Sequence, residues 1–146
     1  MNNKGFTLVE IIAVILILGL LVVITTPAYN SISNNIKTRN YNSKKNTIES
    51  ETLSYVERYL KGEVYDGTNH NHCFTVGYLI ENGIISSDSE KEEYILNDVN
   101  DVEYRNNDAY VFVEYVTENN RFKLKSTFNE GDPDSNSECE IKYKGV

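Results

Sequence analysis

Glu10 is the one ionisable side chain in an apolar stretch that runs from Phe6 to Ile24. A carboxylate in such a helix costs about 2.5 kcal/mol or more to place in lipid, so it needs a partner of opposite charge. Cleavage between Gly5 and Phe6 would create that partner, because the new α-amino group of Phe6 lies four residues before Glu10 and shares its helix face. The same amine could pair with Glu10 of a second copy, which would make Glu10 a device that sets the register of assembly.

The apolar stretch is long enough to hold these groups in a membrane. As a helix, the roughly 20 residues after Gly5 span about 30 Å, the thickness of the hydrocarbon core of a bilayer. We therefore divide the chain into a leader peptide (residues 1–5), a hydrophobic transmembrane and assembly helix (residues 6–27), the amphipathic half of the same helix (residues 28–61) and a globular head (residues 62–146).

The start of the chain resembles a known signal segment. The residues that carry the resemblance are Lys4-Gly5-Phe6-Thr7-Leu8-Val9-Glu10, followed by the apolar run and Pro27. They are similar to the class III signal segment of type IV prepilins and their pseudopilin relatives, and the similarity covers roughly the first 60 residues. The resemblance implies that a prepilin peptidase cuts between Gly5 and Phe6 and methylates the new amine of Phe6, and that Glu10 guides subunit docking.

Two other interpretations of this segment fit less well. A secretory signal peptide has a shorter apolar region that ends in an A-x-A-like cleavage site, and Thr25-Thr26-Pro27-Ala28 is a poor match to such a site. A plain single-span anchor tolerates the length of the apolar run but gains nothing from Glu10. Both are therefore kept only as alternatives.

Pro27 separates the apolar run from an amphipathic continuation. A proline removes one helix hydrogen bond and clashes with the preceding turn, so we expect either a kink or melted stretch at Pro27 or a separate helix that begins there. The resemblance adds Pro27 to the assembly residues, since helices of the family bend or unwind near such a proline. From residue 28 to 61 a helical stripe is expected to pack on a sheet, with Gly62 as its C-cap. The stripe comprises Ile32, Ile36, Tyr41, Ile48, Thr52, Val56, Tyr59 and Leu60.

The predicted fold class is α+β, a long N-terminal helix packed on a head with a small antiparallel sheet. Residues 62–72 are expected to form a loop and Thr75 to Ile85 a short helix. Short strands rich in β-branched and aromatic residues are expected to follow. They are predicted at residues 94–96, 102–104, 109–117 and 121–127, with an edge strand at 140–144.

Charge is distributed unevenly along the chain. Residues 37–45 contain four basic side chains and no acids, whereas residues 46–146 hold 9 basic and 21 acidic side chains. This basic collar either docks against the acidic heads of neighbouring copies or is an ordinary solvated surface. An acidic head offers phosphate groups little clustered positive charge, so direct binding of nucleic acid is not expected.

Cys73 and Cys139 are the only two cysteines. In an oxidising compartment outside the membrane they are expected to form a disulfide, which would close a loop of about 65 residues and stabilise the head by about 4 kcal/mol. Two unpaired thiols are the alternative, because some bacteria with a single membrane seldom use structural disulfides.

Four oxygen-bearing side chains alternate in an acidic loop near the C-terminus: Asp132, Asp134, Asn136 and Glu138. Their spacing matches the first half of a calcium loop. The resemblance to pseudopilins adds that some of them bind calcium in a loop just before the C-terminus. The central Gly and distal Glu of the full calcium pattern are absent, so a solvated loop is the alternative. His70 and His72 suggest a metal site only weakly, since no third ligand is specified. No other cofactor is expected.

The sequence does not predict an enzyme, because no nucleophile–base pair, phosphate loop or cofactor fingerprint is present. An apolar helix with one acid favours self-assembly: storage in the cytoplasmic or inner membrane as a single-pass precursor, leader removal, extraction by an assembly platform, and packing into a helical filament. Our hypothesis is a structural subunit of a type IV pilus (fimbrium) on the bacterial surface, serving adhesion, motility or biofilm. The alternatives are a pseudopilin of a type II secretion or competence DNA-uptake system, and a membrane-anchored binding domain that does not polymerise.

Overall fold

The computed structural model describes residues 6–60, 70–119 and 121–145, without the side chains of residues 24–28, 30, 117 and 122. The chain divides into two compact units, Met1–Thr38 and Arg39–Val146. The boundary between the units falls inside one helix, α1 (Leu8–Tyr59). The expected C-cap Gly62 and the expected loop at residues 62–69 lie outside the described residues.

Helix α1 is 52 residues long and continues through residue 27. The melted stretch and the separate helix expected at Pro27 are therefore both wrong. A proline costs a helix one hydrogen bond, and in α1 several uninterrupted turns on each side sustain the helix across that loss. Within the ranges described above, no helix reaches the length and apolarity that crossing a membrane requires.

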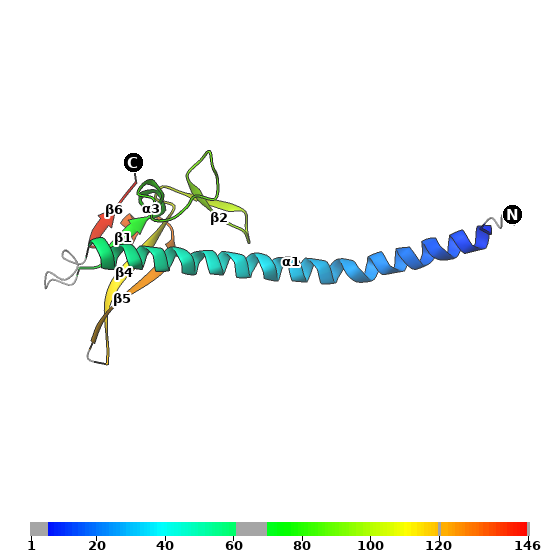
Figure 1. Ribbon diagram of the computed structural model, residues 1–146, viewed down its shortest axis with the longest axis horizontal. Coiled ribbons are helices and arrows are strands. Elements are labelled where there is room, and N and C mark those ends of the chain that lie inside the picture. The colour runs from blue at the N-terminus through cyan, green and yellow to red at the C-terminus, as the bar shows by residue number, and fades with distance from the viewer. Residues whose placement is uncertain (1–5, 61–69, 120, 146) are drawn as a thin grey trace. The chain divides into compact units, whose positions relative to one another are not determined.

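The second unit contains two sheets (Figure 1). A four-stranded sheet has the order β5-β4-β1-β6, and a separate pair joins β2 to β3. The strands are β1 (His72–Thr75), β2 (Tyr94–Asn97), β3 (Val102–Arg105), β4 (Ala109–Glu118), β5 (Arg121–Glu130) and β6 (Ile141–Tyr143). The described residues of the unit also include the short helix α3 (Val76–Glu81) and the 3-10 turn η1 (Pro133–Ser135).

The predicted α+β class is confirmed, with a sheet arrangement that differs from the expected one. Strands lie at all five predicted places, but β2 and β3 form their own sheet instead of extending the larger one. The predicted loop extends to residue 72, whereas strand β1 already begins at His72. It lies between β4 and β6, antiparallel to β4 and parallel to β6. The predicted helix at residues 75–85 is right in place but shorter, because Thr75 is the N-cap of α3 and Asn82 its C-cap.

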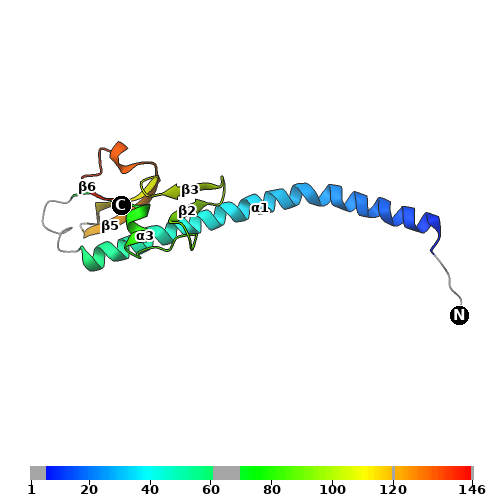
Figure 2. The same cartoon turned by 90° about the horizontal axis from the view of Figure 1, so that it is seen from above.

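The larger sheet is covered on both faces. Phe74, Val111 and Val113 belong to the main core together with Ile48 and Val56 of α1. Alternate residues of the same strands point to the opposite face, since side chains alternate along a strand. There Cys73, Tyr110, Phe112 and Cys139 form a second small cluster. Figure 2 shows the loop that carries η1 over this outer face, away from α1.

Part of the apolar stripe packs on the head, and Leu60 at its end is partly buried against the same core. Tyr41, Ile48, Thr52 and Val56 are buried, as predicted. Burial of each large apolar side chain contributes about 1.5–3 kcal/mol. Ile32, Ile36 and Tyr59, which the stripe also includes, stay exposed at 59%, 52% and 68%.

Polar contacts of Tyr41, Lys44, Glu49 and Tyr55 tie α1 to the head. The Nζ of Lys44 donates to Asp88 Oδ2 at 2.8 Å and to the carbonyl of Leu96 at 2.9 Å, and lies 3.2 Å from Asp98 Oδ2. Burial alone would lower the pKa of Lys44, but the hydrogen bonds to the two aspartates outweigh it and raise that pKa. The carboxylate of Glu49 accepts from the backbone N–H of Phe128 on the outer edge of β5 at 2.7 Å. One cation of the basic collar is thus neutralised by the head of its own chain.

A close backbone approach at Gly77 joins α3 to the turn after β3. The Gly77 N–H donates to the carbonyl of Asn106 at 2.9 Å, and a Cβ on Gly77 would lie 2.8 Å from the Asn106 Cα.

We expect Gly77→Ala to lower the free energy of unfolding by about 1–3 kcal/mol, because backbone atoms must move to admit the methyl group. Urea unfolding followed by circular dichroism measures this loss. The control is Gly83→Ala, where a Cβ meets nothing within 4 Å and only the positive φ of 64° is unfavourable. A loss at Gly77 no larger than at Gly83 would contradict the steric explanation.

Candidate functional site

The candidate site is the N-terminal segment, where a peptide bond and a carboxylate were predicted to act together. Gly5 and the rest of the leader lie outside the described residues. Phe6 and Thr7 precede α1, and the Phe6 side chain is 83% exposed. Glu10 lies in the first turn of the helix.

Glu10 is bound to Thr7 of its own chain. Glu10 Oε2 accepts from the Thr7 backbone N–H at 2.8 Å and from the Thr7 hydroxyl at 2.9 Å, while the Glu10 N–H donates to Thr7 Oγ1 at 3.3 Å. This reciprocal pattern is a capping box, which satisfies N–H groups that a helix leaves unpaired at its start. In the uncut chain, therefore, the carboxylate has a local partner before any amine is released at Phe6. The spacing Thr-x-x-Glu before an apolar run is the signal that sequence reasoning missed.

The first turns of α1 present apolar side chains on every side. All the described residues from Phe6 to Val23 are exposed, with Leu8 at 77% and Val23 at 72%. Exposed apolar surface of this extent marks a surface that something else covers. A helix that is apolar all round and carries one acid thus meets the chemical requirements of a lipid-inserted or self-packing segment.

Comparison with known proteins bears on this segment alone. A family model described as the prokaryotic N-terminal methylation motif matches residues 1–26. The chain carries the hallmark of type IV pilins and pseudopilins. No curated protein and no solved structure matches the chain significantly. The methylation motif confirms the family resemblance of the segment, and it implies processing by a prepilin peptidase and assembly into a pilus-like polymer.

The methylation motif also fits a membrane-anchored precursor that later becomes part of a surface filament. The matched residues include Gly5, Phe6 and Glu10. Cleavage between Gly5 and Phe6, methylation of Phe6 and the assembly role of Glu10 stay predictions, as does the role of Pro27.

The predicted disulfide is present in the head. Cys73 of β1 and Cys139, which follows η1, are bonded, with Cα atoms 5.6 Å apart and a sequence separation of 66. Both cysteines are buried against Tyr110 and Phe112. The bond therefore ties the C-terminal loop to a central strand of the sheet.

In the predicted calcium loop, side-chain oxygens of Asp132, Asp134 and Asn136 contact lysine side chains and backbone N–H groups of the protein. Asp134 contacts both Lys142 and Lys144, and Asp132 Oδ1 accepts from the Asp134 N–H at 2.9 Å. The amide of Asn136 is bound at both ends, its Nδ2 donating to the Tyr110 hydroxyl at 2.9 Å and its Oδ1 accepting from Glu138 N–H at 2.9 Å. Over the described ranges, no three His, Cys, Asp or Glu side chains are grouped so as to hold a metal ion. The structure thus does not bring the four candidate ligands together.

The two histidines have separate environments. His72 begins β1 and is fully buried, its ring stacked on Tyr143 with centroids 5.9 Å apart, so the expectation of a solvated loop at this residue is wrong. His70 is exposed, and its Nδ1 lies 2.7 Å from Glu140 Oε2. The same carboxylate oxygen accepts from the Asn71 N–H at 3.2 Å.

The hydrogen bond with His70, followed by that from Asn71, lowers the pKa of Glu140 below its usual 4.5. A carboxyl group with a lowered folded-state pKa stabilises the fold above its ordinary pKa and loses this contribution as the pH falls. We expect Glu140→Gln to reduce stability at pH 7, and the difference from the parent protein to shrink as the pH falls below 4.5.

Urea unfolding midpoints between pH 7 and pH 2 measure this difference. Glu138→Gln is the matched control, because the Glu138 carboxylate makes no hydrogen bond within the described part of the chain. A constant difference between Glu140→Gln and the parent at all pH values would contradict the linkage.

Proposed function

We propose that the protein is a structural subunit, not an enzyme, that polymerises into a type IV pilus filament on the bacterial surface for adhesion, motility or biofilm formation. The observation that carries this proposal is the exposed apolar start of α1, with Glu10 as its only acid, directly after the cleavage point of a methylation motif. A segment of this kind is stable in lipid and is equally well shielded by identical helices in a bundle.

The chemistry of assembly follows from Glu10. Removal of the leader would release an amine at Phe6, next to the Thr7 cap that holds the carboxylate. In a bundle of processed copies, the amine of one subunit neutralises Glu10 of the next, and only one axial register satisfies both charges. The partners are thus a prepilin peptidase, a membrane assembly platform, the lipid bilayer before assembly, and further copies of the chain. Nucleic acid is not a direct partner, since the head is acidic.

The experiment that tests this function is intact-mass and N-terminal analysis of protein sheared from cells. A chain that begins at N-methylated Phe6 and is recovered in long surface filaments supports the pilus subunit. The same processed chain confined to the cell envelope supports the alternative, a pseudopilin of a type II secretion or competence system. An unprocessed Met1, or cleavage near Ala28, contradicts both.

A further inference from the structure

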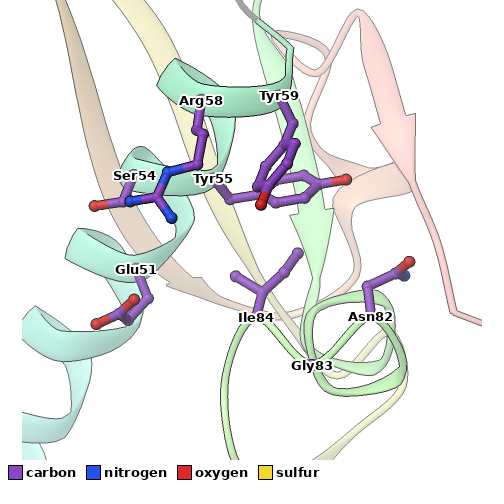
Figure 3. A pocket seen from close by; sticks show the side chains of 8 residues that line it. All are labelled: Glu51, Ser54, Tyr55, Arg58, Tyr59, Asn82, Gly83 and Ile84. Atoms are coloured by element: carbon purple, nitrogen blue, oxygen red, sulfur yellow. The ribbon is translucent and has the colours of Figure 1, made fainter.

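A groove runs along one side of α1 within the second unit. It consists of two adjoining hollows of about 330 and 350 Å³, which share Glu51 and Ile84 in their linings. One wall is α1 from Lys44 to Tyr59, and the other is the segment from Asn82 to Asp88. At a rise of 1.5 Å per residue the α1 wall is about 22 Å long. Figure 3 shows the hollow at the Tyr59 end, with Glu51 and Arg58 on the helix and Ile84 opposite.

The groove has an apolar floor and a polar rim. Ile48, Ile85 and Ile95 line the Lys44 end and are almost fully buried. Glu51 on the rim is exposed, and its carboxylate makes no hydrogen bond or ion pair with any other described residue. Lys44 at the near end faces two aspartates, so that cluster has a net charge of −1. Arg58 lies on the rim at the Tyr59 end, so the acidic part of the rim is at the Lys44 end. A segment with apolar side chains on one face and basic side chains beside them would fit this end of the groove.

The chain has one described segment of that composition. Tyr29, Ile32 and Ile36 are exposed at 72%, 59% and 52%, and their spacing of three and four residues places them on one face of α1. Residues 28–43 also contain Lys37 and Arg39 and no acidic residue. An amphipathic helix that lays residues spaced in this way into an apolar groove is a recurring mode of recognition.

We propose that residues 32–39 of a second copy dock in the Lys44 end of this groove, with the two helices parallel. The occupant is a second copy because the charges are complementary and because a polymer of identical, equally oriented subunits must run its helices in the same direction. Placing Arg39 of one copy beside Glu51 of the other sets the register. In that register Ile32 lies level with Lys44 and Ile36 lies level with Ile48, next to the exposed Thr47 and over the isoleucine floor. The contact rests on the proposed function and specifies which surfaces hold the heads to neighbouring stems.

Charge reversal at one rim residue tests the contact in the intact protein. Glu51→Arg is expected to reduce the polymer recovered per processed subunit at least about tenfold, because like charges across an interface cost several kcal/mol. The matched control is Glu57→Arg, which makes the same change at an exposed position of α1 outside the groove lining. Glu57→Arg is expected to leave the yield within about twofold of the parent. Adding Arg39→Glu to Glu51→Arg is expected to restore the polymer.

Cross-linking between copies provides the second measurement. Cells that express Ile36→Cys and Thr47→Cys as separate chains are treated with a short thiol cross-linker, and cross-linked dimers are expected. Ile36→Cys with Asn46→Cys is the matched pair, since Asn46 is exposed on another side of α1 and lines neither hollow. Equal cross-linking of the two pairs, or equal polymer yields for Glu51→Arg and Glu57→Arg, would overturn the docking inference while leaving the proposed function intact. Absence of any polymer from the processed parent chain would overturn both.

Discussion

Glu10→Gln is expected to abolish polymerisation while the precursor is still made, inserted and processed. The amide keeps the shape of the side chain and can still accept a hydrogen bond from Thr7, so the capping box at the start of α1 is retained. It lacks the negative charge that the Phe6 amine of a neighbouring subunit would pair with. Leaving one partner of a buried ion pair uncompensated costs about 3–5 kcal/mol, which corresponds to a loss of at least about 100-fold in subunit association.

The measurement compares the processed subunit in the membrane fraction with the polymer sheared from the cells. Thr7→Val is the control, because it removes the capping hydroxyl and keeps the charge of Glu10. It is expected to cost about 1 kcal/mol of helix stability and to leave polymerisation largely unaffected. If Thr7→Val prevented assembly as completely as Glu10→Gln, the role of Glu10 would lie in the cap and not in an ion pair between subunits.

Reduction of the Cys73–Cys139 bond is expected to lower the free energy of unfolding of the head by about 4 kcal/mol, since the bond joins residues that are 66 apart in the sequence. Small domains are stable by about 5–15 kcal/mol, so the reduced protein is expected to be only marginally folded. The loss falls on the C-terminal part of the head, because the bond is what joins Cys139 to β1. The outer cluster with Tyr110 and Phe112 would then lose a member.

Urea unfolding of the full chain in detergent, with and without reductant, measures this effect. The variant in which both cysteines are replaced by serine is the control, and reductant should not change its midpoint. An unchanged midpoint on reduction of the parent protein would show that the packing of β6 against β1 holds the C-terminal segment by itself.

Local features of the head were predictable because each is specified by neighbouring residues. The Val- and Tyr-rich run at β4 and the alternating residues at β5 are joined by a short turn, and the register of such a hairpin follows from that turn. Thr75 was recognised as a helix cap for the same reason, since its hydroxyl accepts from Tyr78 three residues on. None of these elements needs a distant partner to be recognised.

Features that depend on distant contacts were not predictable. Strand β1 has four residues, all buried, and therefore lacks the alternation that identifies a strand. It is a strand because β4 and β6, which lie far along the chain, pair with its two edges. The partners of Lys44 are equally distant in the sequence, and the pairing of Asp134 with Lys142 and Lys144 also lies outside the pattern that suggested a calcium loop.

The sequence by itself determined the N-terminal segment: the methylation motif, the apolar run, the solitary acid and the two cysteines. These are contiguous signals or matters of composition, and they indicate assembly without reference to any fold. Only the tertiary structure decided which strands are neighbours, that His72 is buried, that the two cysteines are within bonding distance, and that α1 and residues 82–88 enclose a groove. These contacts join residues that are far apart in the sequence. Burial of the whole core drives the closure of the long loops between them, and no local sequence pattern specifies it.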